Sequence, residues 1–307
     1  MEGNVPERLA ARRGAARERR RARRRRVLAG SMVAVAAAVV AIVALSGGSG
    51  SPGGVKRPAS RAARAAGGRD GSSLVRNARP QSGWKPYTGP VPILAYHVLG
   101  DPIPGAPYPE LFVSRPDFRR QMDWLASHGF EAVTLDQVER AWYHGGSLPP
   151  RPVVLSFDDG YRPQYTFALP VLRHHGWPGV LDLKAKGSDL YTSNVRAMLR
   201  AGWELAAHTI HHLDLTTLDS AQLKLEVAGS RAILRHKYHV AVDNFCYPSG
   251  RFDPAVIAAV KAAGYVGATT EVPGAASRDR PYELDRFEIL GSAGVSGLAA
   301  DLRSAGA

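Results

Sequence analysis

The chain has 307 residues, and its 40 Lys and Arg against 27 Asp and Glu give a formal net charge of +13. Most of the excess lies at the N-terminus, because residues 1–26 carry 11 basic and 3 acidic side chains and residues 27–89 carry 8 and 1. Residues 90–307 are left with 21 basic and 23 acidic side chains. The part of the chain expected to fold is therefore not basic, which excludes nucleic-acid binding through a basic surface.

Residues 27–45 contain no charged side chain and would span about 28 Å as a helix, close to the ~30 Å hydrocarbon core of a bilayer. They predict a single transmembrane signal-anchor. The preceding residues 19–26 are rich in Arg, so we expect residues 1–26 to form a cytoplasmic tail and the catalytic domain to lie outside the cell membrane. A cleaved signal peptide, ending near residues 44–46 and giving a secreted protein, is the alternative, although the apolar run exceeds the usual ~7–15 residues.

Residues 46–89 are rich in Gly, Ser, Pro and Ala with scattered Arg, and they have few large apolar side chains. This composition predicts a flexible linker, because it buries too little surface to fold. Residues 90–307 then form the catalytic domain, which is long enough to build one hydrophobic core. Cys246 is the only cysteine, so no disulfide can form within the chain.

Short apolar runs bounded by turn residues predict strands at 92–97, 132–135, 153–157, 180–183, 202–207, 245–247 and 265–269. Helical spacing of apolar residues falls between them, ending once at Gly129 and interrupted once at Pro170. Asp219 and Asp253 are the expected N-caps of two later helices, and Gly264 follows the end of the second. Alternating strands and helices imply an α/β fold with a parallel sheet, closed or nearly closed into a barrel.

Polar side chains that suit a metal-centred hydrolase follow two of these strands. Asp158 and Asp159 end the strand at 153–157, and His208 and His212 follow the strand that stops at Ala207. Adjacent carboxylates point in different directions, so one can bind a metal while the other takes a proton from water. Histidine nitrogens are ligands that zinc prefers.

Three segments resemble the polysaccharide deacetylase family, also called the NodB-homology domain or carbohydrate esterase family 4. They are SFDDG at 156–160, HTIHH with LDLT at 208–216 and FCYPSG at 245–250, and the resemblance extends over roughly residues 90–295. It implies a distorted (β/α)7 barrel. It also implies that Asp158 is the catalytic base and that Asp159, His208 and His212 hold one divalent metal, usually zinc. His211 lies inside the second motif and is not a ligand in the family.

The third motif departs from the family pattern, in which an Arg pairs with the catalytic Asp. Cys246 stands in that place, so we expect the pKa of Asp158 to be higher than in the common pattern, with Arg251 as a possible replacement. The resemblance gives the backbone N–H of Ser249 a role in holding the oxyanion. Tyr161, directly after the DDG motif, is a candidate substrate contact.

The family's C-terminal histidine, its general acid, has no counterpart at residues 284–290. The PILAYH segment at 92–97 resembles a subgroup that acts on poly-N-acetylglucosamine, in which an N-terminal histidine takes the acid role. His97 is therefore our candidate for the acid, and a structural strand-end histidine is the alternative.

These patterns predict a membrane-anchored, extracellular, metal-dependent enzyme that removes acetyl groups from N-acetylhexosamine units of a polysaccharide. A carbohydrate-binding pseudoenzyme, an O-acetyl esterase on the same scaffold and a wall-anchoring structural protein are the alternatives. The expected partners are the N-acetylated polysaccharide and, through residues 27–45, the membrane. The sequence gives no sign of a protein partner.

Overall fold

The structure, a computed structural model, describes residues 74–306. The predicted cytoplasmic tail at 1–26, the predicted membrane span at 27–45 and most of the predicted linker lie outside this range. Among the residues described, no helix is both long and apolar enough to cross a membrane.

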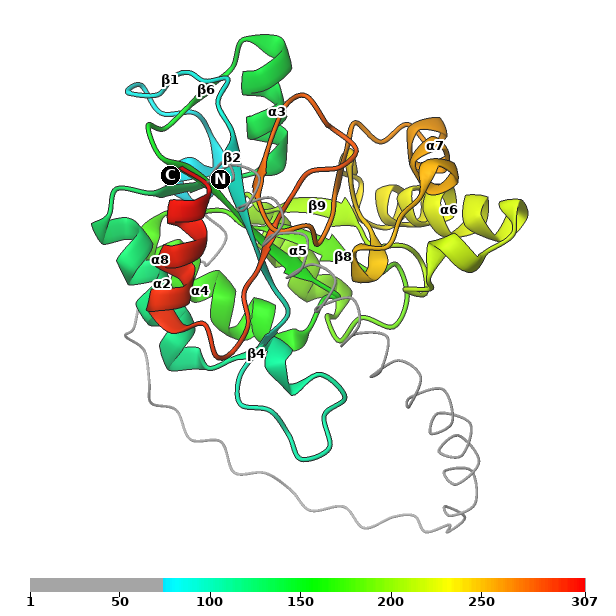
Figure 1. The fold of residues 1–307 in the computed structure, drawn as a ribbon, viewed down its shortest axis with the longest axis horizontal. Helices are drawn as coiled ribbons and strands as arrows, with labels where there is room; N and C mark the ends of the chain where they lie inside the picture. Colours follow the sequence, from blue (N-terminus) through cyan, green and yellow to red (C-terminus); the bar gives the residue numbers. More distant parts are fainter. Residues whose placement is uncertain (1–73, 307) are drawn as a thin grey trace, which may run out of the picture. The chain divides into compact units, whose positions relative to one another are not determined.

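The domain is built on a curled, mainly parallel sheet (Figure 1), with the strand order β11-β10-β9-β8-β7-β2-β12. β13 also pairs with β2, and β5 pairs with β7. The strands of this sheet are β2 (Val91–Tyr96), β5 (Glu131–Val133), β7 (Pro152–Asp158), β8 (Val180–Leu183), β9 (Glu204–Ala207), β10 (Asn244–Cys246), β11 (Gly267–Thr269), β12 (Ala275–Ala276) and β13 (Phe287–Glu288). Two small sheets pair β1 (Lys85–Pro86) with β6 (Ser147–Leu148), and β3 (Val98–Leu99) with β4 (Phe112–Val113).

The C-terminal segment brings the two ends of the sheet together. Leu284 bridges to Thr269 of β11, and three residues later Phe287 pairs with Leu94 of β2. Because the long strands run parallel, their carboxyl ends all face the same side. A site built at that edge therefore collects residues from the whole length of the domain.

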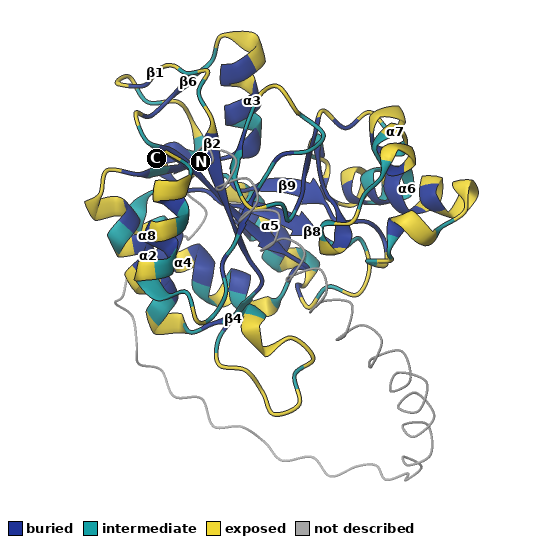
Figure 2. Cartoon of the chain, in the orientation of Figure 1, coloured by how far each residue is buried: buried dark blue, intermediate teal, exposed yellow. Residues whose placement is uncertain are grey.

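Helices cover the outside of the sheet (Figure 1). α2 (Arg115–Ser127), α4 (Leu169–His175) and α8 (Gly294–Ser304) lie together on one side, and α6 (Ser220–Tyr238) packs with α7 (Pro254–Ala262) on the other. α3 (Leu135–His144) and α5 (Thr192–Arg200) complete the set of α-helices in the described part. Each helix buries its sheet-facing side, as the alternation of buried and exposed residues shows (Figure 2).

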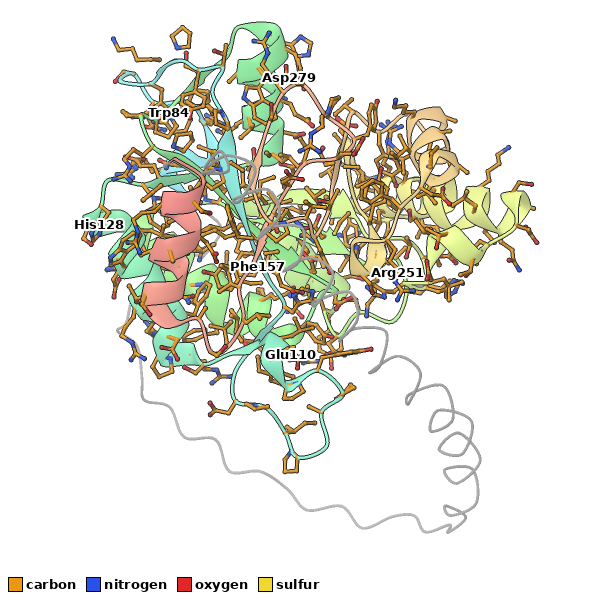
Figure 3. All side chains as sticks on the ribbon, viewed as in Figure 1. Trp84, Glu110, His128, Phe157, Arg251 and Asp279 are labelled. Atoms are coloured by element: carbon orange, nitrogen blue, oxygen red, sulfur yellow. The ribbon has the colours of Figure 1, made fainter. Side chains whose placement is uncertain are left out.

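The strands are buried on both faces, which explains their continuous apolar sequences. Phe157, at the centre of the domain (Figure 3), packs on the helix side against Tyr96 and Trp203, with ring centroids 5.7 and 5.0 Å away. On the other face of β7, Val154 belongs to a second, smaller cluster. Farther along that face lie Ser156 and Asp158, so alternation along β7 places Asp158 inside the curl of the sheet.

Most predicted element positions are confirmed, with informative differences. Asp219 and Asp253 cap α6 and α7 as expected, through bonds from the backbone N–H groups three residues later. Pro170 does not interrupt its helix. A π-helical turn at Gln164–Ala168 runs directly into α4, so Pro170 lies inside a continuous helical segment, and the helix departs from regular α geometry in the turn before the missing N–H.

Residues 74–89, which the sequence places in the linker, pack on the domain. The Val75 N–H donates to the Ala201 carbonyl at 3.0 Å, and the Asn77 N–H donates to the Gly176 carbonyl at 2.8 Å. Asn77 is fully buried, and Trp84 is 8% exposed. The few apolar and amide side chains in this polar stretch anchor it to the domain.

Candidate active site

Four strands bring predicted site residues to one edge of the sheet. β7 ends at Asp158, β10 ends at Cys246, and His97 and His208 directly follow β2 and β9. These strands are linked by parallel pairing through β8, so their carboxyl ends lie side by side. The sequence-predicted base, metal ligands and acid therefore do meet.

The backbone at this edge adopts left-handed conformations in the turns after β7 and β9, at Asp159 with φ 73°, Thr209 with φ 62° and His212 with φ 60°. Residues other than Gly adopt such backbone angles at a cost of roughly 1–3 kcal/mol each. Hydrogen bonds hold them there. The Asp159 N–H donates to the Asp182 carbonyl at 3.0 Å, and the His212 N–H donates to Thr209 Oγ1 at 2.8 Å.

Asp159, His208 and His212 form a set of side chains with the spacing of metal ligands. Their ligand atoms all lie within 4.8 Å of one another. Nε2 of His208 is 3.9 Å and Nε2 of His212 is 3.7 Å from the same oxygen, Oδ1 of Asp159. One carboxylate oxygen and two imidazole nitrogens are a donor set that suits zinc, with room left for further ligands.

The protonation of His208 also fits a metal ligand. Its Nδ1 lies 2.9 Å from the Cys246 carbonyl oxygen, which only accepts, so Nδ1 carries the proton and Nε2 keeps its lone pair toward the site. Burial, together with the neighbouring His212, lowers the pKa of His208 to about 4. The ring is therefore neutral at physiological pH.

Asp158, His208 and Cys246 form a second compact group of potential ligands, but it does not suit a metal. The guanidinium of Arg286 already contacts both Asp158 oxygens and lies 3.2 Å from the Cys246 sulfur. A positive charge at this place repels a second cation. Burial raises the pKa of Cys246, so its thiol stays protonated.

Arg286 is a fully buried partner of Asp158 that the sequence did not reveal. Nη1 and Nη2 donate to the two carboxylate oxygens at 2.8 and 2.9 Å, and Nη1 also donates to Ser156 Oγ. Nη2 donates to Cys246 Sγ, and Nε donates to the Thr270 carbonyl. These five hydrogen bonds match the five N–H donors of a guanidinium.

Arg286 overturns the predicted effect of Cys246 on Asp158. Burial alone would raise the pKa of Asp158, but the charge and hydrogen bonds of Arg286, with His97 nearby, hold it well below its usual range. Arg251 is not the replacement either. It lies at the surface (Figure 3) and pairs with Asp214.

A second buried carboxyl group, Asp182 of β8, shares this environment. Its Oδ2 lies 3.6 Å from Nη1 of Arg286 and has no hydrogen-bond partner among the described residues. Burial and the adjacent Asp158 raise the pKa of Asp182 well above its usual value. These effects favour the neutral form of Asp182, whereas Asp158 makes the two short contacts with the guanidinium of Arg286.

His97 lies where the sequence predicts. It is 7% exposed, and its Nε2 is 3.8 Å from Oδ2 of Asp158. Gln164 holds the backbone of both His97 and Asp158, because its Nε2 donates to their carbonyl oxygens at 3.0 and 2.6 Å.

Tyr161, Ser249 and His211 lie in three different places. Tyr161 is at the site, since its hydroxyl hydrogen-bonds Asp159, and burial followed by that carboxylate raises its pKa. Ser249 is exposed in a turn after β10 and has a left-handed φ of 51°. His211 points elsewhere: its Nδ1 contacts Glu226 Oε1 at 2.7 Å, and Glu226 also accepts the His211 N–H.

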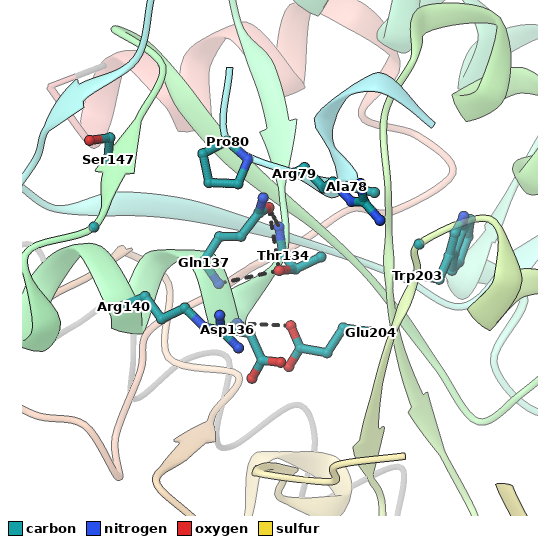
Figure 4. A pocket seen from close by; sticks show the side chains of 12 residues that line it. Ala78, Arg79, Pro80, Thr134, Asp136, Gln137, Arg140, Ser147, Trp203 and Glu204 are labelled. Atoms are coloured by element: carbon teal, nitrogen blue, oxygen red, sulfur yellow. Dashed lines mark hydrogen bonds between the residues drawn. The ribbon is translucent and has the colours of Figure 1, made fainter. Parts of the chain in front are cut away.

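A pocket of about 330 Å³ lies at the opposite edge of the sheet, where β9 begins (Figure 4). Glu204 lines it, but its oxygens already accept hydrogen bonds from the Asp136 N–H at 2.9 Å and from Asn244 Nδ2 at 3.0 Å. Burial raises the pKa of Glu204. None of the residues that line this pocket is a histidine, so the grouping of carboxylates with histidines is found at the carboxyl edge instead.

Fold and site together define an α/β protein with a curled parallel sheet and a set of metal-type ligands at the carboxyl ends of its strands. Residues 145–268 match the model of the family described as polysaccharide deacetylase. The Bacillus subtilis protein YxkH, named as a polysaccharide deacetylase, is 31% identical over 68% of this chain and 74% of its own length. A Staphylococcus aureus poly-beta-1,6-N-acetyl-D-glucosamine N-deacetylase is 25% identical over 58% of this chain and 67% of its own length.

Solved structures show the same fold. The Streptococcus pyogenes deacetylase PplD superposes with a TM-score of 0.65 at 22% identity, over 71% of this chain and 99% of that one. IcaB from Ammonifex degensii superposes with a TM-score of 0.56 at 23% identity, over 69% of this chain and 96% of that one. The chain belongs to the polysaccharide deacetylase family, and it is a hydrolase of carbon–nitrogen bonds other than peptide bonds.

Replacing Arg286 with Met should lower the free energy of unfolding by about 3–5 kcal/mol at neutral pH, because it leaves Asp158 buried without its counter-charge. In the unaltered chain the depressed pKa of Asp158 contributes stability above the unfolded pKa of about 4, and this contribution is lost as the pH falls below it. In the variant, burial raises the pKa of Asp158. The deficit should therefore be smallest below pH ~4 and grow toward neutrality.

Denaturant unfolding of both chains across this pH range measures the effect. Arg280→Met is the matched control, since Arg280 is half exposed and pairs with Asp285 at the surface, where a pair contributes roughly 1 kcal/mol or less. A deficit for Arg286→Met that equals that of the control, or that does not change with pH, would contradict the assignment.

Proposed function

We propose that this protein hydrolyses the N-acetyl group of N-acetylhexosamine units in a polysaccharide, with one divalent metal, zinc by its donor set. One observation carries the proposal: an ionised carboxylate, Asp158, lies between a histidine and an adjacent Asp-His-His ligand set. The names of the relatives that act on polysaccharide or on poly-N-acetylglucosamine support the substrate class. We take the curled sheet to be the distorted (β/α)7 barrel that the family resemblance implies.

Asp159, His208 and His212 would hold the metal. When bound, such an ion supplies Lewis acidity toward the acetyl carbonyl and lowers the pKa of a water molecule. The protein residues supply the geometry, because His208 is fixed by the Cys246 carbonyl and His212 by the turn that Thr209 closes.

Asp158 takes the proton from the attacking water. Oxygen of that water adds to the acetyl carbon, the carbon–nitrogen bond breaks, and His97 donates a proton to the departing nitrogen. Backbone N–H groups, that of Ser249 among them, hold the negative charge on the carbonyl oxygen, and Tyr161 contacts the substrate. The products are acetate and a hexosamine unit whose amine is cationic at neutral pH.

His97→Ala should lower turnover on an N-acetylglucosamine oligomer by about 10²- to 10⁴-fold, because the leaving amine loses its proton donor. A good leaving group needs no acid, so activity on an activated aryl acetate should be far better preserved. Acetate release and aryl ester hydrolysis measure the two reactions. Equal losses on both would make His97 a structural residue, and no release of acetate by the unaltered chain from chitin, peptidoglycan or poly-N-acetylglucosamine would favour a binding protein.

His208→Ala should lower affinity for zinc by more than about 100-fold, since even the groups that orient ligands contribute 10- to 100-fold. Metal content after equilibration with buffered zinc is the measurement. His211→Ala is the control, because His211 adjoins the site but contacts Glu226. Stoichiometric zinc in the His208 variant would exclude the proposed ligand set.

We also propose that the domain is held outside the cell by a single span at residues 27–45, with 1–26 in the cytoplasm, as the Arg-rich flank favours. Protease added to intact cells should then remove everything beyond about residue 50 and spare the N-terminus. Accumulation of the free domain in the medium, beginning near residue 46, would show instead that a signal peptide is cleaved.

A further inference from the structure

Lys184 lies beside the proposed metal ligands, in a place that the backbone fixes from both sides. It directly follows β8. On one side, the His208 N–H donates to the Leu183 carbonyl at 3.0 Å, and on the other the Ala185 N–H donates to the Thr209 carbonyl at 3.0 Å. The pairing of β8 with β9 therefore continues past both strand ends and holds Lys184 next to His208.

Strand alternation points the Lys184 side chain to the inside of the curled sheet. Leu181 and Leu183 belong to the hydrophobic cluster on the helix side, so Asp182 and Lys184 face the inside. Asp182 lies level with Asp158, and Lys184 lies one inward-facing position closer to the carboxyl edge. The Lys184 side chain is only 20% exposed, and its Nζ lies 5.9 Å from the centre of the Tyr161 ring.

The ammonium of Lys184 contacts an oxygen atom of the proposed ligand set. Its Nζ lies 3.4 Å from Oδ1 of Asp159, the same oxygen that faces Nε2 of both His208 and His212. The other carboxylate of the site, Asp158, is committed to Arg286. Asp159 is therefore the anion that balances Lys184, and the two together bring no net charge to the ligand set.

We propose that Lys184 is a built-in competitor that weakens the binding of a divalent metal by Asp159, His208 and His212. This inference rests on the proposed metal site. A divalent ion that takes Oδ1 must displace the ammonium from that oxygen and still remains close to its charge. Repulsion between a double and a single positive charge about 5 Å apart, even at the dielectric constant of water, corresponds to roughly a tenfold loss of affinity.

The consequence is a site that loads only where the metal is plentiful and that exchanges it more readily than a bare Asp-His-His set. It also gives Lys184 a role distinct from that of a ligand or base. A lysine that merely oriented Asp159 would strengthen metal binding, so the sign of the effect separates the two roles.

Lys184→Met removes the charge and keeps the aliphatic stem. In the full-length protein, chelator competition should show that this variant binds Zn²⁺ and Co²⁺ about tenfold or more tightly than the unaltered chain, and that it releases them more slowly. Lys184→Gln should act in the same direction. Lys186→Met is the matched control, because Lys186 lies two residues further on and is exposed. The affinity of this variant for both ions should stay within about twofold of that of the unaltered chain.

Equal or weaker metal binding by both Lys184 variants, with thermal unfolding that shows them folded, would overturn the inference while leaving the proposed function intact. An unaltered chain that binds neither ion would instead overturn the proposed metal site, and the inference with it. Tighter binding by Lys184→Met that Lys186→Met matches would show a general charge effect and would also overturn the specific role of Lys184.

Discussion

The buried pair of Arg286 and Asp158 is the interaction on which the site depends. Removing two charges from water costs several kcal/mol per ion, and only a two-point contact with every remaining donor satisfied offsets that cost. Arg286 meets this condition by bonding also to Ser156, Cys246 and Thr270. It thereby ties the segment that joins the two ends of the sheet to β7, which ends in Asp158. The same side chain thus holds the sheet in its curled form and positions Asp158.

This pair also constrains the chemistry. A carboxylate held ionised by a guanidinium is well placed but weakly basic, since the same contacts that lower its pKa lower its affinity for a proton. Ordinary water is too weak an acid for such a base. A divalent ion that made the water more acidic would close this gap, and the adjacent Asp-His-His set has the donors that we propose for such an ion. His97, with Nε2 3.8 Å from Oδ2 of Asp158, is close enough to serve as the proton donor that we propose.

The sequence predicted those parts of the site that are local in the chain and missed those that depend on folding. Asp158 and Asp159 could be read from a strand followed by a turn, and His208 and His212 from the next such pattern. Arg286 is 128 residues from Asp158 and occupies the place expected for a different arginine, so no spacing identifies it. Asp182 of β8 and Lys184 directly after it carried a usable signal, because charged residues at alternate positions of an apolar strand mark a face that meets other polar groups.

The two neighbouring aspartates show how one backbone turn gives equal side chains different roles. Asp158 ends β7 facing inward, where Arg286 neutralises it, whereas Asp159 adopts a left-handed φ of 73° and turns toward the histidines. Lys184 approaches the second carboxylate and leaves the first alone, because strand alternation places it one layer above Asp182. A guanidinium has the planar fork that saturates a carboxylate, while an ammonium makes a single, displaceable contact. The cation beside each aspartate thus suits the role that we propose for it, the fixed Asp158 as base and the more accessible Asp159 as metal ligand.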